Sequence, residues 1–178
     1  MKDVNLFLDM DGVMAKWQED KTFEEVAMPG YFATLPVVEN IVEAIKMIHK
    51  NNKIKALNVN IHLKILSATF DDNHSRKDKR QWLKEKLPFI KEKDICFVNV
   101  GEDKAQCIDK KRHNFLLDDK SSNLFAFEKA GGIGIKCYNH CNGTKGTWNG
   151  YNIRNTMTAE KIATQLYGII LAHISVAA

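Results

Sequence analysis

Several features are scarce or missing in this sequence of 178 residues. No apolar stretch approaches the ~20 residues that a membrane helix needs. The N-terminus runs into an apolar segment without the basic, apolar and small-residue order of a secretory signal. Internal repeats and low-complexity tracts are missing too. We therefore expect a folded cytoplasmic protein without membrane association.

Cysteine is also scarce. The four cysteines are Cys96, Cys107, Cys137 and Cys141. Without a secretory signal, reduced thiols are the expectation. Cys137, His140 and Cys141 could contribute to a zinc site, with another cysteine or His113 as the fourth ligand. The chain lacks the paired C-x2-C knuckle that zinc sites commonly use. We therefore interpret the cysteines as structural.

Length and charge bound the remaining possibilities. A chain of 178 residues with 44% hydrophobic content can form one domain with a real core, and it is too short for two full ones. The formal net charge of +4 fits an anionic substrate or a nucleic-acid surface and decides neither. A solvated basic face is the simpler interpretation.

Apolar runs alternate with helical periodicity along the chain. We predict strands at 4–8, 61–66, 95–98, 115–117 and 133–135, and helices at about 38–48, 74–86, 121–130 and 158–173. Segment 139–152 is rich in Asn and Gly and is expected to be loop. Segment 51–60 could extend a helix or add a short edge strand. This alternation predicts an α/β fold, a three-layer sandwich around a parallel, Rossmann-like sheet.

Ligands of such sheets bind beyond the carboxyl ends of the strands. The first strand ends in Leu8-Asp9-Met10-Asp11-Gly12. Residues two apart on an extended chain face the same side, so Asp9 and Asp11 can enter one crevice. Two such carboxylates can supply a nucleophile and a proton donor for phosphoryl transfer. An acidic turn without function and a calcium loop are the alternatives.

Three further groups suit phosphate chemistry, each with a structural alternative. Ser67 follows the second strand, where it can bind a phosphoryl oxygen or cap a helix. Lys104 can neutralise anionic oxygens or be one more surface lysine. Asp118 and Asp119 end the fourth predicted strand, with Asn123 shortly after. They can complete a hard-cation site, or Asp119 can cap the following helix.

Taken in order, D-x-D-G, a hydroxyl, a lysine and an acidic pair resemble the motif set of the haloacid dehalogenase-like phosphatases. The closer resemblance is to their 5'(3')-deoxyribonucleotidase branch, including bacterial and phage relatives. It spans roughly residues 4–150, and the stretches that carry it are 9–15, 29–32, 65–68, 117–119, 131–136 and 142–148.

The resemblance implies a role for each acidic residue. Asp9 would be the nucleophile that becomes an aspartyl-phosphate, and Asp11 would protonate the leaving oxygen and then activate water. Asp9, the backbone carbonyl of Asp11 and Asp118 would bind Mg²⁺. Asp119 would contact the metal indirectly, through one of its ligands or through water.

The resemblance also implies a phosphate site and a cap. Ser67, the backbone of Ala68, and Lys104 would bind the phosphate. Ser67 stands where many members have threonine, and both residues supply a hydroxyl. Lys104 lies 14 positions before Asp118, with the basic stretch 110–113 between them.

The chain is expected to be a single domain, 1–178, with a small helical cap inserted at about residues 15–35. This segment, called the cap segment below, contains Trp17, Tyr31 and Phe32, which would contact the substrate base. Their alternative role is the cap's own small core.

These observations predict a magnesium-dependent phosphomonoester hydrolase acting on a small phosphate, most simply a (deoxy)nucleoside monophosphate. A phosphatase for a sugar phosphate is the alternative within enzymes. The alternative from another class is a non-catalytic protein of the same fold that binds nucleic acid or a partner. This alternative is disfavoured because a binding protein has no need of Asp9, Asp11 and Asp118 together. The sequence leaves open whether the protein forms a homodimer.

Overall fold

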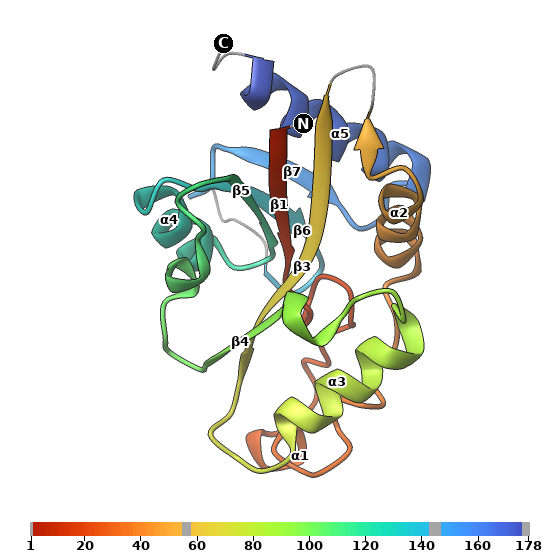
Figure 1. The fold of residues 1–178 in the computed structure, drawn as a ribbon. Coiled ribbons are helices and arrows are strands. Elements are labelled where there is room, and N and C mark those ends of the chain that lie inside the picture. Colours follow the sequence, from red (N-terminus) through yellow and green to blue (C-terminus); the bar gives the residue numbers. More distant parts are fainter. Residues whose placement is uncertain (1, 55–57, 143–146, 176–178) are drawn as a thin grey trace.

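The computed structural model describes residues 2–54, 58–142 and 147–175. These residues form a seven-stranded sheet with helices on both sides (Figure 1). The strands are β1 (Lys2–Leu8), β2 (Lys53–Ile54), β3 (Val59–Thr69), β4 (Ile95–Asn99), β5 (His113–Asp118), β6 (Ile133–Tyr138) and β7 (Tyr151–Arg154). Their order is β2-β3-β1-β5-β6-β7, and β4 also pairs with β3. Every pairing is parallel except that of β2, which confirms the predicted α/β fold.

The helices form the two outer layers. They are α1 (Phe23–Val26), α2 (Glu39–Lys50), α3 (Ser75–Lys86), α4 (Ser121–Lys129) and α5 (Ala159–Ser175), with short 3-10 turns η2 (Glu92–Asp94) and η3 (Lys104–Cys107). Helices α2 and α5 pack on one another, and α4 covers β5 and β6 from the other side (Figure 1). The sandwich thus has three layers, as predicted.

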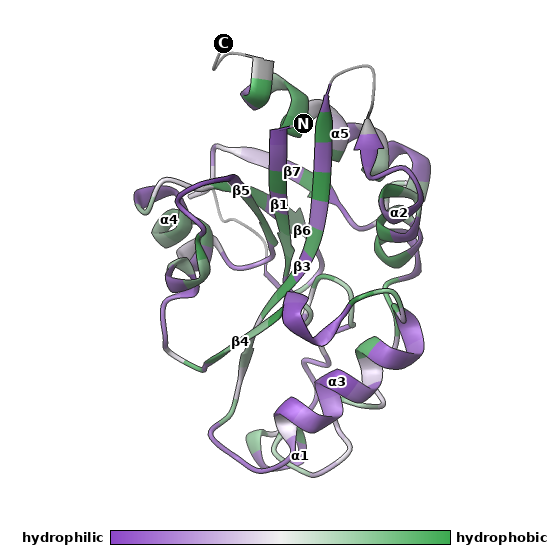
Figure 2. Cartoon of the chain, viewed as in Figure 1, coloured by the Kyte–Doolittle hydropathy of each residue, from purple (hydrophilic) through white to green (hydrophobic). Residues whose placement is uncertain are grey.

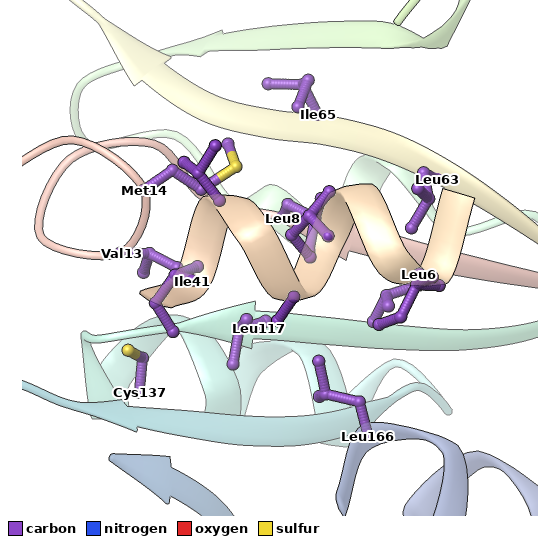
Figure 3. Close-up of a cluster of buried hydrophobic side chains, with 14 of the residues drawn as sticks. Leu6, Leu8, Val13, Met14, Ile41, Leu63, Ile65, Leu117, Cys137 and Leu166 are labelled. Carbon is purple, nitrogen blue, oxygen red and sulfur yellow. The ribbon is translucent and has the colours of Figure 1, made fainter. Parts of the chain in front are cut away.

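Strand β1 shows why the sheet is buried on both faces. Leu6 and Leu8 point to the α2 and α5 side, where they pack with Ile41 and Leu166 (Figure 3). Phe7 points to the opposite side and packs against Phe127 of α4. This alternation follows from the two-residue period of a strand. Burial of each such side chain contributes roughly 1.5–3 kcal/mol to the stability of the fold. The end of β1, which Asp9 follows directly, is therefore firmly held.

Two short edge strands refine the predicted element map. Segment 51–60 contains β2, which pairs antiparallel with β3, so the edge-strand alternative is confirmed. Residues 55–57 of that segment lie outside the described part. The prediction of loop throughout 139–152 is wrong at its end, where β7 pairs parallel with β6. Only Ile153 of β7 is buried, so this edge strand has no apolar pattern to reveal it. Residues 143–146 lie outside the described part.

The cap segment lies beside α3 at the end of the sheet toward which the parallel strands run (Figure 1). A capping box between Thr22 and Glu25 starts α1. Helix α3 then holds the segment through two hydrogen bonds. The Gly30 N–H donates to Asp78 Oδ2 (2.6 Å), and Trp82 Nε1 donates to the Leu35 carbonyl (2.8 Å). Helix α3 is mostly hydrophilic, whereas hydrophobic (green) and hydrophilic (purple) bands alternate along β3 (Figure 2).

The cysteines do not all match the prediction. Cys96 of β4 and Cys107 of η3 form a disulfide, so the expectation of four reduced thiols is wrong for this pair. The chain reverses between β4 and η3 and brings the two side chains together, which spacing alone does not reveal. Cys137 and Cys141 are free. Among the described residues, no helix has the length and apolar character needed to cross a membrane.

Candidate active site

The carboxyl ends of three neighbouring strands bring the predicted residues together. Leu8 of β1 pairs with Ile65 of β3 on one side and with Leu117 of β5 on the other. The next residue, Asp9, donates its N–H to the Leu117 carbonyl at 3.0 Å. Asp9 therefore lies between the ends of β3 and β5, as the topology predicts.

Lys104 links the two acidic strand ends. Its Nζ lies 2.7 Å from Asp9 Oδ2 and 2.7 Å from Asp118 Oδ2, and its side chain is 3% exposed. Asp103 caps η3 by accepting the Ala105 N–H (2.8 Å), which fixes the start of the turn that carries Lys104. The sequence-based placement of Lys104 near the two aspartates therefore agrees with the geometry.

These contacts set the charge of the site. Burial disfavours the charged form of Asp9, but Lys104, and more weakly Lys79, more than offset this and lower its pKa. Burial also disfavours a charged Lys104, yet Asp9 and Asp118 hold its pKa above the ordinary value. Asp9 is thus an anion with both carboxylate oxygens fixed, because Oδ1 accepts the Met10 N–H at 2.8 Å.

Asp11 has a separate environment built around Lys79, which sequence reasoning missed. Lys79 Nζ lies 2.5 Å from Asp11 Oδ2, 3.1 Å from Ser67 Oγ and 2.6 Å from the Ala68 carbonyl. Burial and the charge of Asp9 nevertheless raise the pKa of Asp11, against the opposing effect of Lys79. A carboxyl that keeps its proton more readily suits a general acid.

A helical pattern could have indicated Lys79. It precedes Trp82 and Leu83 by three and four residues, so it shares their inward face on α3. Its side chain is fully buried, and its Nζ lies 4.7 Å from the centre of the Phe32 ring. A lysine on an apolar helix face is a candidate for a buried ion pair.

Side-chain amides hold the acidic pair at the end of β5, Asp118 and Asp119. Asp118 Oδ2 accepts from Asn123 Nδ2 at 3.0 Å. Asp119 Oδ2 accepts from the side-chain amides of Asn139 and Asn142, each at 2.8 Å. Gly12 approaches the same oxygen so closely that a Cβ there would lie 2.1 Å from it, and its φ of +76° also requires glycine.

Three carboxylates form a candidate metal centre. Oxygens of Asp9, Asp118 and Asp119 all lie within 4.8 Å of one another, and all three residues are buried. Burial, with the nearby charges of Asp9 and Asp118, raises the pKa of Asp119 to about 7. Negative charge is therefore in excess there, and a hard divalent cation with oxygen ligands fits the donor set. The structure places Asp119 in the same cluster as the two predicted ligands.

A cavity of about 650 Å³ opens over these residues. Its lining includes both catalytic candidates, Asp9 and Asp11, together with Ala68, Lys104 and Asp119. The aromatic part of the cavity wall consists of Trp17 and Phe32 from the cap segment, together with Phe70. Within the described residues, Tyr31 and Ser67 are outside this lining. Tyr31 packs edge-on against Trp17 and Phe32, and Ser67 contacts Lys79.

Comparisons with known proteins show the family to which this chain belongs. Residues 16–147, well over half of the chain, match the family described as "5' nucleotidase, deoxy (Pyrimidine), cytosolic type C protein". The chain belongs to this nucleotidase family. It is therefore a phosphatase of the 5'-nucleotidase type, and its family implies a small nucleotide phosphate as substrate.

One solved structure supports the fold of this nucleotidase. It is a haloacid dehalogenase-like hydrolase from Burkholderia xenovorans LB400, with 14% sequence identity and a TM-score of 0.55. The match covers 93% of this chain and 99% of that one. A comparison with curated proteins finds no match.

Proposed function

We propose that this nucleotidase hydrolyses (deoxy)nucleoside monophosphates through an aspartyl-phosphate on Asp9, with Mg²⁺ as cofactor and Asp11 as general acid and base. One observation carries the proposal. Asp9 and Asp11 line one cavity, and their surroundings shift the two pKa values in opposite directions. Such divergence assigns a charged carboxylate to attack and a protonated one to donate.

In the first step, a carboxylate oxygen of Asp9 forms a bond to phosphorus while the bond from phosphorus to the ester oxygen breaks. Asp11 gives its proton to the leaving oxygen, which departs as the nucleoside hydroxyl. Lys104 contacts Asp9 and lines the cavity, so its ammonium group can offset charge on the phosphoryl oxygens.

In the second step, Asp11 has become a carboxylate and can accept a proton from water. The water oxygen attacks phosphorus, the bond to Asp9 breaks, and inorganic phosphate leaves. Lys79 contacts Asp11 at 2.5 Å and stabilises the carboxylate form that this step requires. Lys79 is therefore a positioning residue that favours the carboxylate form of Asp11.

Mg²⁺ would be held by Asp9 and Asp118, by the backbone carbonyl of Asp11, and by Asp119 directly or through water. When bound, it supplies positive charge that stabilises the phosphoryl oxygens in the transition state. The excess of carboxylate around Asp119 supports this assignment. Replacing Asp118 with alanine should raise the Mg²⁺ concentration needed for activity or abolish activity.

We further propose that the cap segment covers the site and that a nucleobase stacks on its aromatic side chains. Trp17 and Phe32 lie on the cavity wall with Phe70, and two of the phosphate-binding candidates, Ala68 and Lys104, line the same cavity. Base–aromatic stacking contributes about 1–3 kcal/mol per base. Membership of a family of cytosolic 5' nucleotidases for deoxypyrimidines supports deoxypyrimidine nucleotides as substrates and a cytosolic location.

A substrate panel tests this proposal. The EDTA-treated protein is assayed with deoxynucleoside monophosphates, sugar phosphates and p-nitrophenyl phosphate, before and after Mg²⁺ is added back. We expect activity to require Mg²⁺ and to be highest on a deoxynucleotide. Rapid hydrolysis of sugar phosphates without hydrolysis of nucleotides would favour the alternative function, a phosphatase for a sugar phosphate. Full activity in metal-free buffer would contradict the cofactor assignment.

A further inference from the structure

A second group of potential metal ligands lies between the cap segment and the loop after β6. It consists of Glu19, His140 and Cys141, whose ligand atoms lie within 4.8 Å of one another. The Cys141 thiol also forms a hydrogen bond with the Glu19 carboxylate. Two segments separated by about 120 residues in sequence thus place a carboxylate, an imidazole and a thiol at one point.

The loop that carries two of these ligands is held in place by Asn139. The Asn139 Oδ1 accepts the N–H groups of Cys141 (3.0 Å) and Asn142 (2.7 Å). Its Nδ2 donates to the Gly12 carbonyl (2.7 Å) and to Asp119 Oδ2 (2.8 Å). His140 and Cys141 are therefore fixed relative to the active site, as the ligands of a built metal site need to be.

The ligand types of this second group favour a different metal ion than those of the acidic centre do. Thiolate and imidazole suit Zn²⁺, whereas Mg²⁺ takes oxygen ligands. Zinc ligands lie about 2.0–2.3 Å from the ion, so small side-chain rotations suffice to bring all three onto one ion. Glu19 and His140 are exposed and Cys141 is partly exposed, so an ion can reach them from solvent.

We propose that Glu19, His140 and Cys141 bind one Zn²⁺ ion, with water as the fourth ligand, and that this ion joins the cap segment to the loop after β6. Binding transfers the thiol proton of Cys141 to solvent and uses the neutral imidazole of His140. Cys137, which the sequence places in the same motif, is fully buried and outside this group.

The position of the ion predicts an effect on turnover. Glu19 follows Trp17 by two residues, and Cys141 precedes Asn142 by one. Trp17 and Asn142 both line the active-site cavity. Zinc would therefore tie two parts of the cavity wall together and slow the passage of substrate and product. The predicted inhibition by Zn²⁺ rests on the proposed phosphatase function, whereas the binding of Zn²⁺ to these three residues does not.

Binding is tested first by isothermal titration calorimetry, in which Zn²⁺ is titrated into the whole protein in saturating Mg²⁺. We expect one equivalent to bind, with affinity lowered about tenfold or more in Glu19→Gln, His140→Ala and Cys141→Ser. The matched controls Glu24→Gln in α1 and His49→Ala in α2 alter exposed residues of the same types and should bind like the wild type. Binding that is missing, or equal in all variants, would overturn the proposal.

Two further measurements separate this site from the acidic centre. With Co²⁺ in place of Zn²⁺, a thiolate ligand gives a near-ultraviolet charge-transfer band, which Cys141→Ser should remove and Cys137→Ala should keep. Zn²⁺ should also slow p-nitrophenyl phosphate hydrolysis by the wild type far more than by Glu19→Gln, a surface variant that preserves the core. A band lost equally in both cysteine variants, or equal inhibition of wild type and Glu19→Gln, would contradict the proposal.

Discussion

Replacing Lys79 with methionine tests how the structure controls the protonation of Asp11. The change removes an ammonium group 2.5 Å from Asp11 Oδ2 and keeps a side chain of similar length. Breaking a buried ion pair costs about 3–5 kcal/mol of unfolding free energy. The Asp11 side chain is 22% exposed, and its carboxyl can take up a proton. We therefore expect a loss near the lower end, about 3 kcal/mol at pH 8.

The loss should depend on pH. Burial and Asp9 raise the pKa of Asp11, and Lys79 opposes them, so removing Lys79 raises this pKa further. A carboxyl with a higher pKa in the folded than in the unfolded state binds more protons when folded, and stability then falls as pH rises. The variant should therefore be closer to wild type at pH 5 than at pH 8, as urea unfolding at both values can show.

The same substitution should affect the two chemical steps unequally. A protonated Asp11 can still donate to the leaving oxygen, but it cannot accept a proton from water. Phosphoenzyme should therefore accumulate while kcat falls by about 100-fold or more, as acid quenching with phosphate-labelled substrate can show. Lys77→Met, an exposed residue of α3, is the matched control. A folded Lys79→Met variant that keeps the wild-type kcat and accumulates no more phosphoenzyme than wild type would contradict this role of Lys79.

Asp11→Asn should slow nucleotide hydrolysis by about 10²–10⁴-fold and p-nitrophenyl phosphate hydrolysis less, because nitrophenolate leaves without a proton; equal losses in kcat/KM would exclude the acid role. Trp17→Ala should raise KM for a deoxynucleotide about tenfold, or about 1.4 kcal/mol, and hardly affect p-nitrophenyl phosphate; parallel losses would mean that Trp17 holds the cap together. The pKa of Asp119 is about 7, so protons should compete with Mg²⁺, and its affinity should rise by up to about tenfold per pH unit toward pH 7. Mg²⁺ titrations that give the same affinity at pH 5.5 and 7.5 would contradict this.

Much of the fold was predictable because its signals are local. The buried parallel strands are short apolar runs with acidic residues at their ends, since Asp9 follows β1 directly and Asp118 is the last residue of β5. Parallel pairing then brings these residues to one edge of the sheet. The edge strand β7 was not predictable in this way, because backbone pairing with β6 defines it and few of its side chains are buried.

Contacts between distant segments were harder to predict. Lys79 lies in a polar helix, and its partner Asp11 is 68 residues away. The disulfide partner of Cys96 and the proximity of Glu19 to Cys141 likewise depend on how loops fold back on the sheet. Residue types at these positions allow many partners, and tertiary structure selects among them.

The proposed mechanism requires an aspartyl-phosphate on Asp9, and this intermediate can be trapped. Wild type and Asp9→Asn are mixed with phosphate-labelled substrate in Mg²⁺, quenched with acid and examined for label on the protein. Asp71→Asn, which makes the same chemical change at an exposed position, is the control. We predict label at Asp9 in wild type and in Asp71→Asn, and none in a folded Asp9→Asn variant. Magnesium-dependent turnover near the wild-type rate in Asp9→Asn, or label that persists there, would contradict the mechanism.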